Sequence, residues 1–398
     1  MRHTKSMDNE LTELLQALVS IPSVNPALAD DDATGGEARL ADFLADDLRE
    51  RGFRVEMLEL ISGRPNVIAR FGPAHPKRVI MIEAHTDTQG IHGMTVPPFD
   101  AELRDGRLYG RGACDTKGPM AAALHALDAD VLAQLLDAGI ELIFAGAIGE
   151  ERGNIGAEQL VDAGITCDEA LVLEPTGLQI VHAHKGTFWF EIEIRGTAGH
   201  GSQPEKGVSA IHGMMKAIEA LMLQTAEDQA KKNNPLLGKT TTNIGVIRGG
   251  SSINIVPDRC VVEVDCRTLP GDDTRGIFDR FRARLSALQQ AGHFTGFDIR
   301  LIKETPPYET AAESPMIARL KTALAESGVA PVSCGVGWYS DAGPFSRVAN
   351  AVAVFGPGSI AQAHTADEFI ELSSLEIGAE IIRRYLLKTA EDVKAGGR

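Results

Sequence analysis

The sequence predicts an α/β fold: a mostly parallel sheet with helices on both faces, into which a smaller α+β domain is inserted. Two patterns predict this fold. Short apolar runs alternate with helical patterns over the first 175 residues, which is typical of βαβ units. After residue 186 the strands alternate apolar and charged residues, as half-exposed antiparallel strands do. The chain has 398 residues, too many for one ordinary compact core, so two domains are expected.

The elements of the first domain follow from apolar periodicity and from the residues that end each run. Apolar residues at helical spacing predict helices, and the second of these helices stops at Gly52. Short apolar runs bounded by turn residues predict strands. In chain order we expect a helix at 9–19, a helix at 36–51, strands at 54–60, 66–70 and 78–83, a helix at 118–138, a strand at 140–148, a short helix at 157–163 and a strand at 170–173.

The inserted domain has the order β-α-β-β-α-β, which is typical of a ferredoxin-like fold. Its expected elements are a strand at 188–195, a helix at 208–224, strands at 240–248 and 260–267, a helix at 274–291 and a strand at 297–303. A helix at 314–327 and a strand at 351–355 then return to the first pattern. Residues 1–185 and 305–398 are therefore predicted to form one discontinuous domain, interrupted by residues 186–304.

Composition restricts the partners and the compartment. The net charge of −16 argues against nucleic acid or an anionic membrane as the main partner, because either would need a basic surface. The five cysteines are scattered and form no C-x-x-C pair, so reduced thiols are expected. The N-terminus, MRHTKSMDNELTELLQ, lacks the apolar core of a signal peptide, and no apolar run approaches about 20 residues. A cytoplasmic protein is expected.

Candidate metal ligands follow four of the predicted strands. The carboxyl ends of parallel strands share one edge of a sheet, where ligands bind. The candidates are His85 after 78–83, Glu150 and Glu151 after 140–148, Glu174 after 170–173, His364 after 351–355, and Asp115 in a Gly-rich loop before the helix at 118. Imidazoles and carboxylates without thiolates suit Zn²⁺, Co²⁺ or Mn²⁺. One carboxylate shared by two ions, with a histidine and a carboxylate terminal on each, would use the set economically. Of the adjacent pair Glu150-Glu151, one carboxylate could hold metal while the other holds a proton.

Each candidate also has an ordinary structural interpretation. A histidine after a strand, such as His85 or His364, is often a surface or hydrogen-bonding residue. Asp115 could cap the following helix, and Glu174 before proline could be a solvated turn residue. Asp87 could be an exposed loop acid, or it could fix the tautomer of the neighbouring imidazole. The shared location at strand ends favours a metal site over these separate interpretations.

Five motifs together resemble the M20 metallopeptidase family, over about residues 10–385. They are His85-Thr-Asp, Tyr109-Gly-Arg-Gly-Ala-Cys-Asp-Thr-Lys-Gly, Gly149-Glu-Glu, Leu173-Glu-Pro-Thr and Gly356-Pro-Gly-Ser-Ile-Ala-Gln-Ala-His. The resemblance implies a zinc-exopeptidase-like domain with two divalent ions, usually zinc, and a lid domain through which subunits dimerise. It further implies His85 and Glu174 on one ion, Glu151 and His364 on the other, Asp115 as the bridge, Glu150 as general base and Asp87 as the partner that orients His85.

The inserted domain carries further family-like features. Gly196-Thr-Ala-Gly-His200 is similar to the lid loop, in which the histidine stabilises the tetrahedral intermediate in the partner subunit's site. The resemblance also implies substrate contacts for Asn254, Arg267 and Gly358. An arginine suits bidentate capture of a carboxylate, and a histidine suits an oxyanion. Taken without the family, the first two would be a turn asparagine and an exposed arginine at a strand end, and His200 an ordinary loop residue.

Within the family, the segments 174–186 and 356–368 most resemble acetylornithine deacetylases. This implies an amidohydrolase that removes a short acyl group from an N-acyl amino acid, with N-acetylornithine as the expected substrate, in arginine biosynthesis. The segment Ser340-Asp-Ala-Gly departs from the family's usual Cys-Thr-Glu-Ala or Gly-Thr-Asp-Ala, so the side chain of the substrate stays open. The alternatives are a succinyl-diaminopimelate desuccinylase, a glutamate-type carboxypeptidase, and a metal-dependent binding protein without catalysis.

Overall fold

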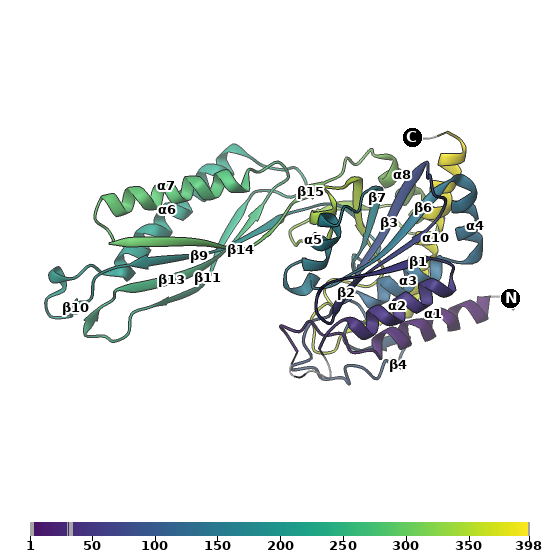
Figure 1. Cartoon of the computed structure of the whole chain (residues 1–398), viewed down its shortest axis with the longest axis horizontal. Helices are drawn as coiled ribbons and strands as arrows, with labels where there is room; N and C mark the ends of the chain where they lie inside the picture. Colours follow the sequence, from purple (N-terminus) through teal and green to yellow (C-terminus); the bar gives the residue numbers. More distant parts are fainter. Residues whose placement is uncertain (1–3, 30, 32–34, 397–398) are drawn as a thin grey trace. The chain divides into compact units, whose positions relative to one another are not determined.

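The computed structural model describes residues 4–29, 31 and 35–396, and its contacts divide the chain into two compact units. The first unit contains Met1–His182, Glu309–Cys334 and Ser340–Arg398, and the second contains Ala183–Tyr308 and Gly335–Tyr339. Figure 1 shows the elements of both units. The sequence assigned 335–339 to the first domain, whereas these residues pack with the second unit. Residues 1–3, part of the stretch in which no signal peptide is expected, lie outside the described residues.

The first unit is built on a mixed sheet with a parallel centre. Its strand order is β1-β2-β6-β3-β7-β17-β8-β15, and β16 pairs with β8. The four central neighbours β6, β3, β7 and β17 are parallel, while β1, β2 and β8 join antiparallel. The strands are β1 (Arg54–Ile61), β2 (Arg64–Phe71), β3 (Arg78–His85), β6 (Ile140–Ala147), β7 (Cys167–Leu173), β8 (Ile180–His184), β15 (Tyr308–Glu309), β16 (Ser333–Val336) and β17 (Ala349–Phe355). The prediction of a mostly parallel sheet is confirmed.

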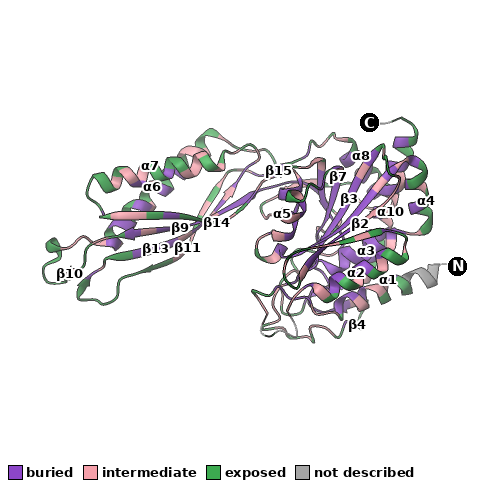
Figure 2. Ribbon diagram, in the orientation of Figure 1, coloured by how far each residue is buried: buried purple, intermediate pink, exposed green. Residues whose placement is uncertain are grey.

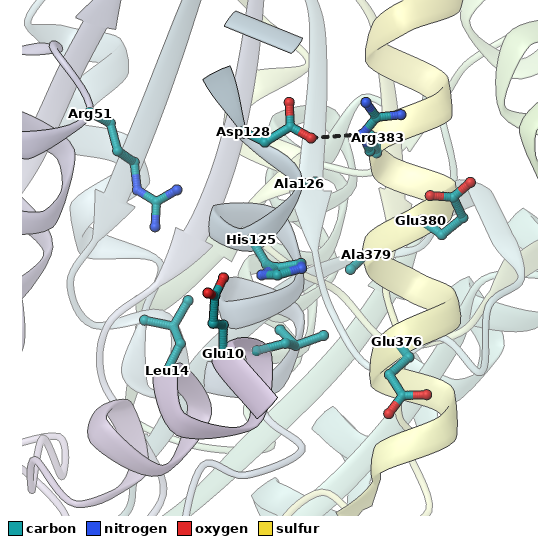
Figure 3. A pocket seen from close by; sticks show the side chains of 11 residues that line it. Glu10, Leu14, Arg51, His125, Ala126, Asp128, Glu376, Ala379, Glu380 and Arg383 are labelled. Carbon is teal, nitrogen blue, oxygen red and sulfur yellow. Dashed lines mark hydrogen bonds and ion pairs between the residues drawn. The ribbon is translucent and has the colours of Figure 1, made fainter. Parts of the chain in front are cut away.

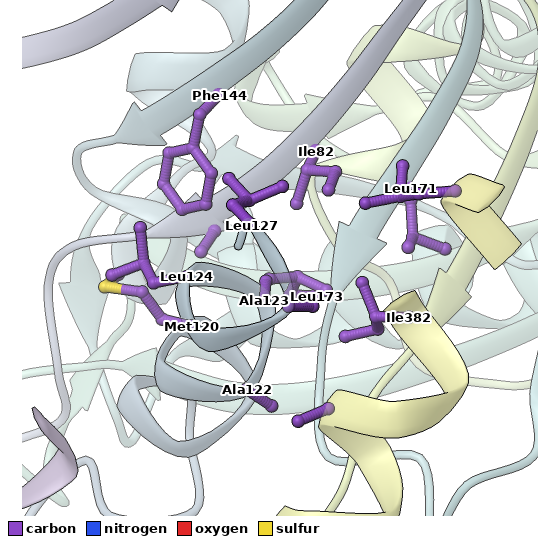
Figure 4. Close-up of a cluster of buried hydrophobic side chains, with 14 of the residues drawn as sticks. Ile82, Met120, Ala122, Ala123, Leu124, Leu127, Phe144, Leu171, Leu173 and Ile382 are labelled. Atoms are coloured by element: carbon purple, nitrogen blue, oxygen red, sulfur yellow. The ribbon is translucent and has the colours of Figure 1, made fainter. Parts of the chain in front are cut away.

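Helices bury both faces of the central strands, which are coloured as buried in Figure 2. One face packs on a large apolar cluster contributed by α1, α2, α3, α4, α8 and α10. Figure 4 shows part of it, where Met120 and Leu124 of α3 and Ile382 of α10 meet side chains from the strands. The helices of this unit are α1 (Thr4–Val19), α2 (Ala38–Glu50), α3 (Lys117–Ala126), α4 (Ala129–Ala138), α5 (Ile155–Asp162), α8 (Pro315–Glu326), α9 (Ala342–Phe345) and α10 (Leu372–Lys394). Alternate strand residues such as Met81 and Ile143 are buried on the opposite face, where α5 and α9 contact the sheet.

One predicted helix differs in the structure, and one long helix was not predicted. The single helix predicted at 118–138 is two helices, because Asp128 adopts extended backbone and its carboxylate accepts a hydrogen bond from Val131 N at 2.8 Å. That capping interaction starts α4 as a new helix. The long C-terminal helix α10 adds to the predicted elements, and it fills the core beside α3, α4 and α8.

The second unit has the predicted β-α-β-β-α-β order. Its antiparallel sheet has the order β11-β13-β9-β14, and α6 and α7 pack on it through a separate apolar core. The elements are β9 (Gly186–Arg195), α6 (Ala210–Lys231), β11 (Thr241–Gly249), β13 (Arg259–Thr268), α7 (Thr274–Gln290) and β14 (Gly296–Thr305). A short two-stranded antiparallel sheet of β10 (Gly199–His200) and β12 (Ile255–Val256) lies outside this sheet.

A small three-stranded sheet in the first unit positions part of the candidate site. It has the order β18-β5-β4, with β4 (Glu102–Arg104), β5 (Arg107–Tyr109) and β18 (Phe369–Glu371). Its register places Phe369 opposite Tyr109, so the chain around residue 368 lies beside the Gly-rich loop that follows β5. Among the helices of the described residues, none combines the length and the apolar character that a membrane crossing needs.

Candidate metal centre

The predicted ligands lie at one edge of the central sheet. His85 is the last residue of β3, Glu174 follows the last residue of β7, and Glu150 begins a short 3₁₀ turn, Glu150–Arg152, just after β6. These strands are parallel neighbours, so their carboxyl ends meet at the same edge. The loop before α3 brings in Asp115, and the segment after β17 brings in His364.

Five of the predicted residues form two groups that share one member. His85, Asp115 and Glu174 form one group, and Asp115, Glu151 and His364 form the other; within each group the ligand atoms lie within 4.8 Å of one another. The two oxygens of Asp115 face different groups: His85 Nε2 is 3.1 Å from Oδ1, and His364 Nε2 is 3.2 Å from Oδ2. The N-cap residue of α3 is Thr116, one position after Asp115. The two oxygens of Asp115 thus have the arrangement that a bridging carboxylate requires.

Asp87 holds the turn that carries the adjacent glutamates. Its carboxylate accepts hydrogen bonds from Glu150 N at 3.0 Å, from Glu151 N at 3.2 Å and from Asn25 Nδ2 at 2.8 Å. The oxygen nearest to His85 Nδ1 is the backbone carbonyl of Asp87, at 2.9 Å, whereas the Asp87 carboxylate lies 3.6 Å away. Asp87 therefore contacts His85 chiefly through its main chain, and its side chain is committed to the Glu150–Glu151 turn.

Both histidines of the centre and the shared Asp115 have strongly shifted pKa values. Burial disfavours the charged imidazole of His85, but the nearby carboxylates of Asp115 and Asp87 outweigh burial and raise its pKa well above the usual value. Hydrogen bonds to Asp115 and Glu151 raise the pKa of His364 to about 10. Burial opposes ionisation of Asp115, yet its contacts with the two histidines lower its pKa.

The other two ligand carboxylates, Glu174 and Glu151, have raised pKa values, in contrast to the lowered pKa of Asp115. Burial, followed by repulsion from Asp115, raises the pKa of Glu174 well above its usual value, and the same two causes raise that of Glu151. Glu151 Oε2 lies 3.1 Å from His364 Nε2 and accepts a hydrogen bond from Gln89 Nε2 at 3.0 Å. Its other oxygen, Oε1, is buried and has no hydrogen-bond partner in the structure. Crowded, buried carboxylates with an unused oxygen are a suitable environment for cations.

The donor set fits two divalent ions. Each group offers one imidazole and two carboxylates, and the unused Glu151 Oε1 is a ligand atom with no other role. Mixed imidazole and carboxylate donors suit Zn²⁺, and they also suit Co²⁺ and Mn²⁺. Glu150 belongs to neither group, and its backbone N–H is bound by Asp87.

Three buried residues to which sequence reasoning assigned no role in the site are linked to Glu150, directly or through one another. Asn154 Nδ2 donates to Glu150 Oε1 at 3.3 Å and to Asp341 Oδ1 at 2.8 Å. Burial raises the pKa of Asp341 to about 6, and burial together with Asp341 raises that of Glu83 well above its usual value. The sequence contains a signal for one of these residues, Glu83. Between the first residue of β3, Arg78, and its last, His85, Glu83 is the one charged residue in an apolar strand.

The residues predicted for the inserted domain do not all lie together. His200 pairs with Ile255 in the two-stranded sheet β10–β12, and Asn254 O accepts a hydrogen bond from Gly201 N, so His200 and Asn254 share one small platform. Arg267 lies near the far end of β13, roughly 25 Å along the strand from its start beside that platform. Its guanidinium donates to Asp265 Oδ2 and lies over the ring of Tyr339.

Gly358 has a structural reason to be glycine. Its φ of +85° is unfavourable for other residues, and a Cβ there would lie 2.7 Å from Cys114 Sγ. Its carbonyl accepts a hydrogen bond from Gly177 N at 2.7 Å. Gly358 thus packs the segment after β17 against the loop that carries Asp115.

A separate cavity of about 440 Å³ is lined by residues of α1, α3 and α10 (Figure 3). It contains none of the candidate ligands. Its two arginines are already engaged, Arg383 with Asp128 at 2.8 Å and Arg51 with Asp47 at 2.7 Å. Its lining therefore offers no guanidinium to a ligand without breaking an existing ion pair.

Comparison with known proteins identifies the family. The model of peptidase family M20/M25/M40 matches residues 81–388. Acetylornithine deacetylase from Proteus mirabilis (strain HI4320) is 31% identical over 381 residues, which cover 94% of this chain and 95% of that protein.

Solved structures share the fold. Aminopeptidase PepT from Bacillus cereus ATCC 10987 superposes with a TM-score of 0.77 at 22% identity, over 96% of this chain and 99% of that one. The Bacillus subtilis YXEP protein, described as a dinuclear metal binding peptidase from the M20 family, gives a TM-score of 0.72 at 16% identity, over 97% and 99%. The family match spans most of the chain and includes all five candidate ligands, so the chain is a metallohydrolase that belongs to peptidase family M20/M25/M40.

Proposed function

We propose that the protein is a dinuclear metal amidohydrolase that removes a short acyl group from an N-acyl amino acid, with N-acetylornithine as its substrate. The observation that carries the proposal is Asp115, shared by two ligand groups beside a glutamate, Glu150, that belongs to neither. Relatives named acetylornithine deacetylase, at about 30% identity over most of the chain, support the choice of substrate.

In this proposal His85 and Glu174 hold one ion, Glu151 and His364 hold the other, and Asp115 bridges them. Zinc is the expected metal, and cobalt or manganese would also suit these donors. When bound, two divalent ions would polarise the scissile carbonyl and lower the pKa of a water molecule.

The proton transfers are assigned to Glu150. Its carboxylate takes a proton from the attacking water and passes it to the leaving nitrogen, as a general base and then a general acid. Asp87 accepts a hydrogen bond from the backbone of Glu150, and Asn154 donates to its Oε1, so both the backbone and the carboxylate of Glu150 are held in place.

The second unit is assigned the role of a lid that completes substrate binding. His200 stabilises the oxyanion from the partner subunit, and Asn254 and Arg267 contact the substrate carboxylate. For Arg267 this requires exchange of its hydrogen bonds with Asp265 for bonds to the substrate. Gly358 would contribute its backbone, since it has no side chain.

Kinetics on a panel of substrates tests the proposed reaction. The zinc- and cobalt-loaded enzyme is expected to give its highest kcat/KM on N-acetylornithine, with lower values on N-succinyl-diaminopimelate and on peptides ending in glutamate. A preference for the succinyl compound would indicate the desuccinylase, and a preference for C-terminal glutamate would indicate the carboxypeptidase. Metal binding without hydrolysis of any member of the panel would leave the binding-protein alternative.

We also propose that two copies associate through the second unit. On α6, Met215 is 56% exposed and Met222 is 46% exposed, seven positions apart and so on one side of the helix. The neighbouring β11 is an edge strand, and its Ile247 is 59% exposed. An exposed apolar stripe beside an unpaired strand edge favours association with another protein surface.

The double substitution Met215→Glu with Met222→Glu is expected to convert a dimer to a monomer in size-exclusion chromatography with light scattering. If His200 acts in the partner's site, the monomer should lose activity to the same extent as His200→Ala, about 10²- to 10³-fold. Leu60→Glu, at an exposed position in the first unit, is the matched control. A fully active monomer would refute the partner role of His200, and a double variant that stays dimeric would refute the α6 interface.

A further inference from the structure

We propose that Glu368 is a positioning residue that fixes Asp115 and thereby sets the affinity of both metal positions together. The inference rests on the proposed function, because it needs two ions that share the Asp115 carboxylate. Glu368 is not one of the candidate ligands, and nothing in its immediate sequence, Ala366-Asp-Glu-Phe, distinguishes it from a surface acid.

The Glu368 carboxylate is buried, with 1% of the residue exposed, and it accepts four hydrogen bonds. Oε2 accepts from Arg111 Nη1 at 2.6 Å and from Gly112 N at 3.1 Å. Oε1 accepts from Cys114 N at 2.9 Å and from Asp115 N at 3.0 Å. Three main-chain donors of one loop, at residues 112, 114 and 115, and a guanidinium therefore converge on a single side chain.

The local backbone explains why the donors converge. Strand β18 begins directly after Glu368 and pairs with β5, and Gly110 N donates to the Glu368 carbonyl at 3.1 Å. The loop then turns through Gly112, whose φ of +81° is favourable for glycine. The backbone N–H groups of this loop point towards the Glu368 carboxylate, as N–H groups point towards an anion in a backbone nest. Without the carboxylate these buried donors would lose their acceptor, and the loop would have to rearrange to satisfy them.

The loop carries Asp115, the residue that the two ligand groups share. Asp115 is held at its own N–H by Glu368, while its Oδ1 faces His85 and its Oδ2 faces His364. Glu368 lies four residues after His364, so it also ties the loop to the segment that carries a ligand of the second group. A shift of Asp115 would disturb both groups at once. The affinity for each ion should therefore depend on Glu368, although Glu368 touches neither ion.

The test is a Co²⁺ titration of the metal-free protein, followed by the visible absorption of bound cobalt and by competition with a chelator. Glu368→Gln places an amide NH₂ where only acceptors fit, so both dissociation constants are expected to rise by about 10- to 100-fold, the usual effect of losing a residue that supports a ligand. Asp367→Asn, at the exposed neighbouring position, is the control and should leave both constants unchanged. Arg111→Met removes one charged donor and keeps the carboxylate, so it should raise both constants by a smaller factor, and it serves as the test if Glu368→Gln does not fold.

Three results would overturn the inference while the proposed function stands. One is a folded Glu368→Gln protein that binds two Co²⁺ ions with wild-type constants. Another is weakening of only one constant, because a shared Asp115 requires both to change. The third is a lower unfolding temperature with unchanged metal affinity, which would indicate a role in folding alone. A wild-type protein that binds fewer than two ions would instead refute the dinuclear centre, and the inference with it.

Discussion

Replacing Glu150 with glutamine is expected to lower kcat by about 10²- to 10⁴-fold while both metal ions stay bound. The amide has nearly the shape of the carboxylate but cannot accept a proton, so the transfer from water to the leaving nitrogen fails. Metal content should not change, because Glu150 is in neither ligand group. The measurements are steady-state kcat on N-acetylornithine and metal content by elemental analysis of the dialysed protein.

The adjacent residue provides a matched control. Glu151→Gln makes the same chemical change one position along the chain, but it removes a ligand that faces His364 and Asp115. This variant should lose activity together with one metal ion, and added metal should restore part of the activity. Wild-type turnover in fully metal-loaded Glu150→Gln protein would contradict the assignment of the general base. The paired variants thus separate proton transfer from metal binding within one dipeptide.

The grouping of the candidate ligands could be predicted because it depends on a simple property of parallel sheets. His85, Glu151 and Glu174 each follow a strand that the apolar pattern marks clearly, and parallel strands bring their carboxyl ends to one edge. These residues are far apart in sequence, yet their convergence can be predicted without any distance in space. In the structure each of them lies in a ligand group that includes Asp115.

The residues that support the site could not be predicted in this way. Asn154 and Asp341 are hydrogen-bonded across 187 positions, and Glu368 contacts the Asp115 loop across 253 or more positions. No local pattern distinguishes such a carboxylate from a solvated one, because its role arises only when distant segments pack together. The break between α3 and α4 was missed for a different reason: the apolar spacing continues through it, and only the cap at Asp128 reveals it.

In the inserted domain, the order of the elements could be predicted, but the relative positions of side chains could not. Its β-α-β-β-α-β order was readable from alternating residues and was confirmed, yet the order says little about which side chains meet. His200 and Asn254 lie together at the two-stranded sheet β10–β12, whereas Arg267 is at the other end of β13 with Asp265 and Tyr339. A single chain therefore does not gather the three predicted lid residues into one place.

Removing the carboxylate of Glu169 is expected to lower the free energy of unfolding by about 3–5 kcal/mol. Glu169 is buried near the start of β7, away from the carboxyl edge, and it accepts hydrogen bonds from Arg319 and from Tyr385 Oη at 2.6 Å. Arg78 Nη1 lies 3.4 Å from the same carboxylate. In Glu169→Ala both buried guanidinium groups would lose this counter-charge, and urea unfolding followed by circular dichroism measures the loss. Glu313→Ala, an exposed glutamate on the same unit, is the control and should change stability by less than about 0.5 kcal/mol.

A second substitution tests whether the loss comes from the unpaired charges. Adding Arg319→Met to Glu169→Ala removes one of the two cations, so the double variant should be more stable than the sum of the single losses predicts, a coupling of about 0.5–3 kcal/mol. Additive losses would show that packing, and not charge pairing, accounts for the effect. Because Glu169 lies away from the edge that carries the ligands, turnover of the folded Glu169 variants at low temperature should equal that of the wild type. Stability and catalysis would then depend on opposite ends of the same strands.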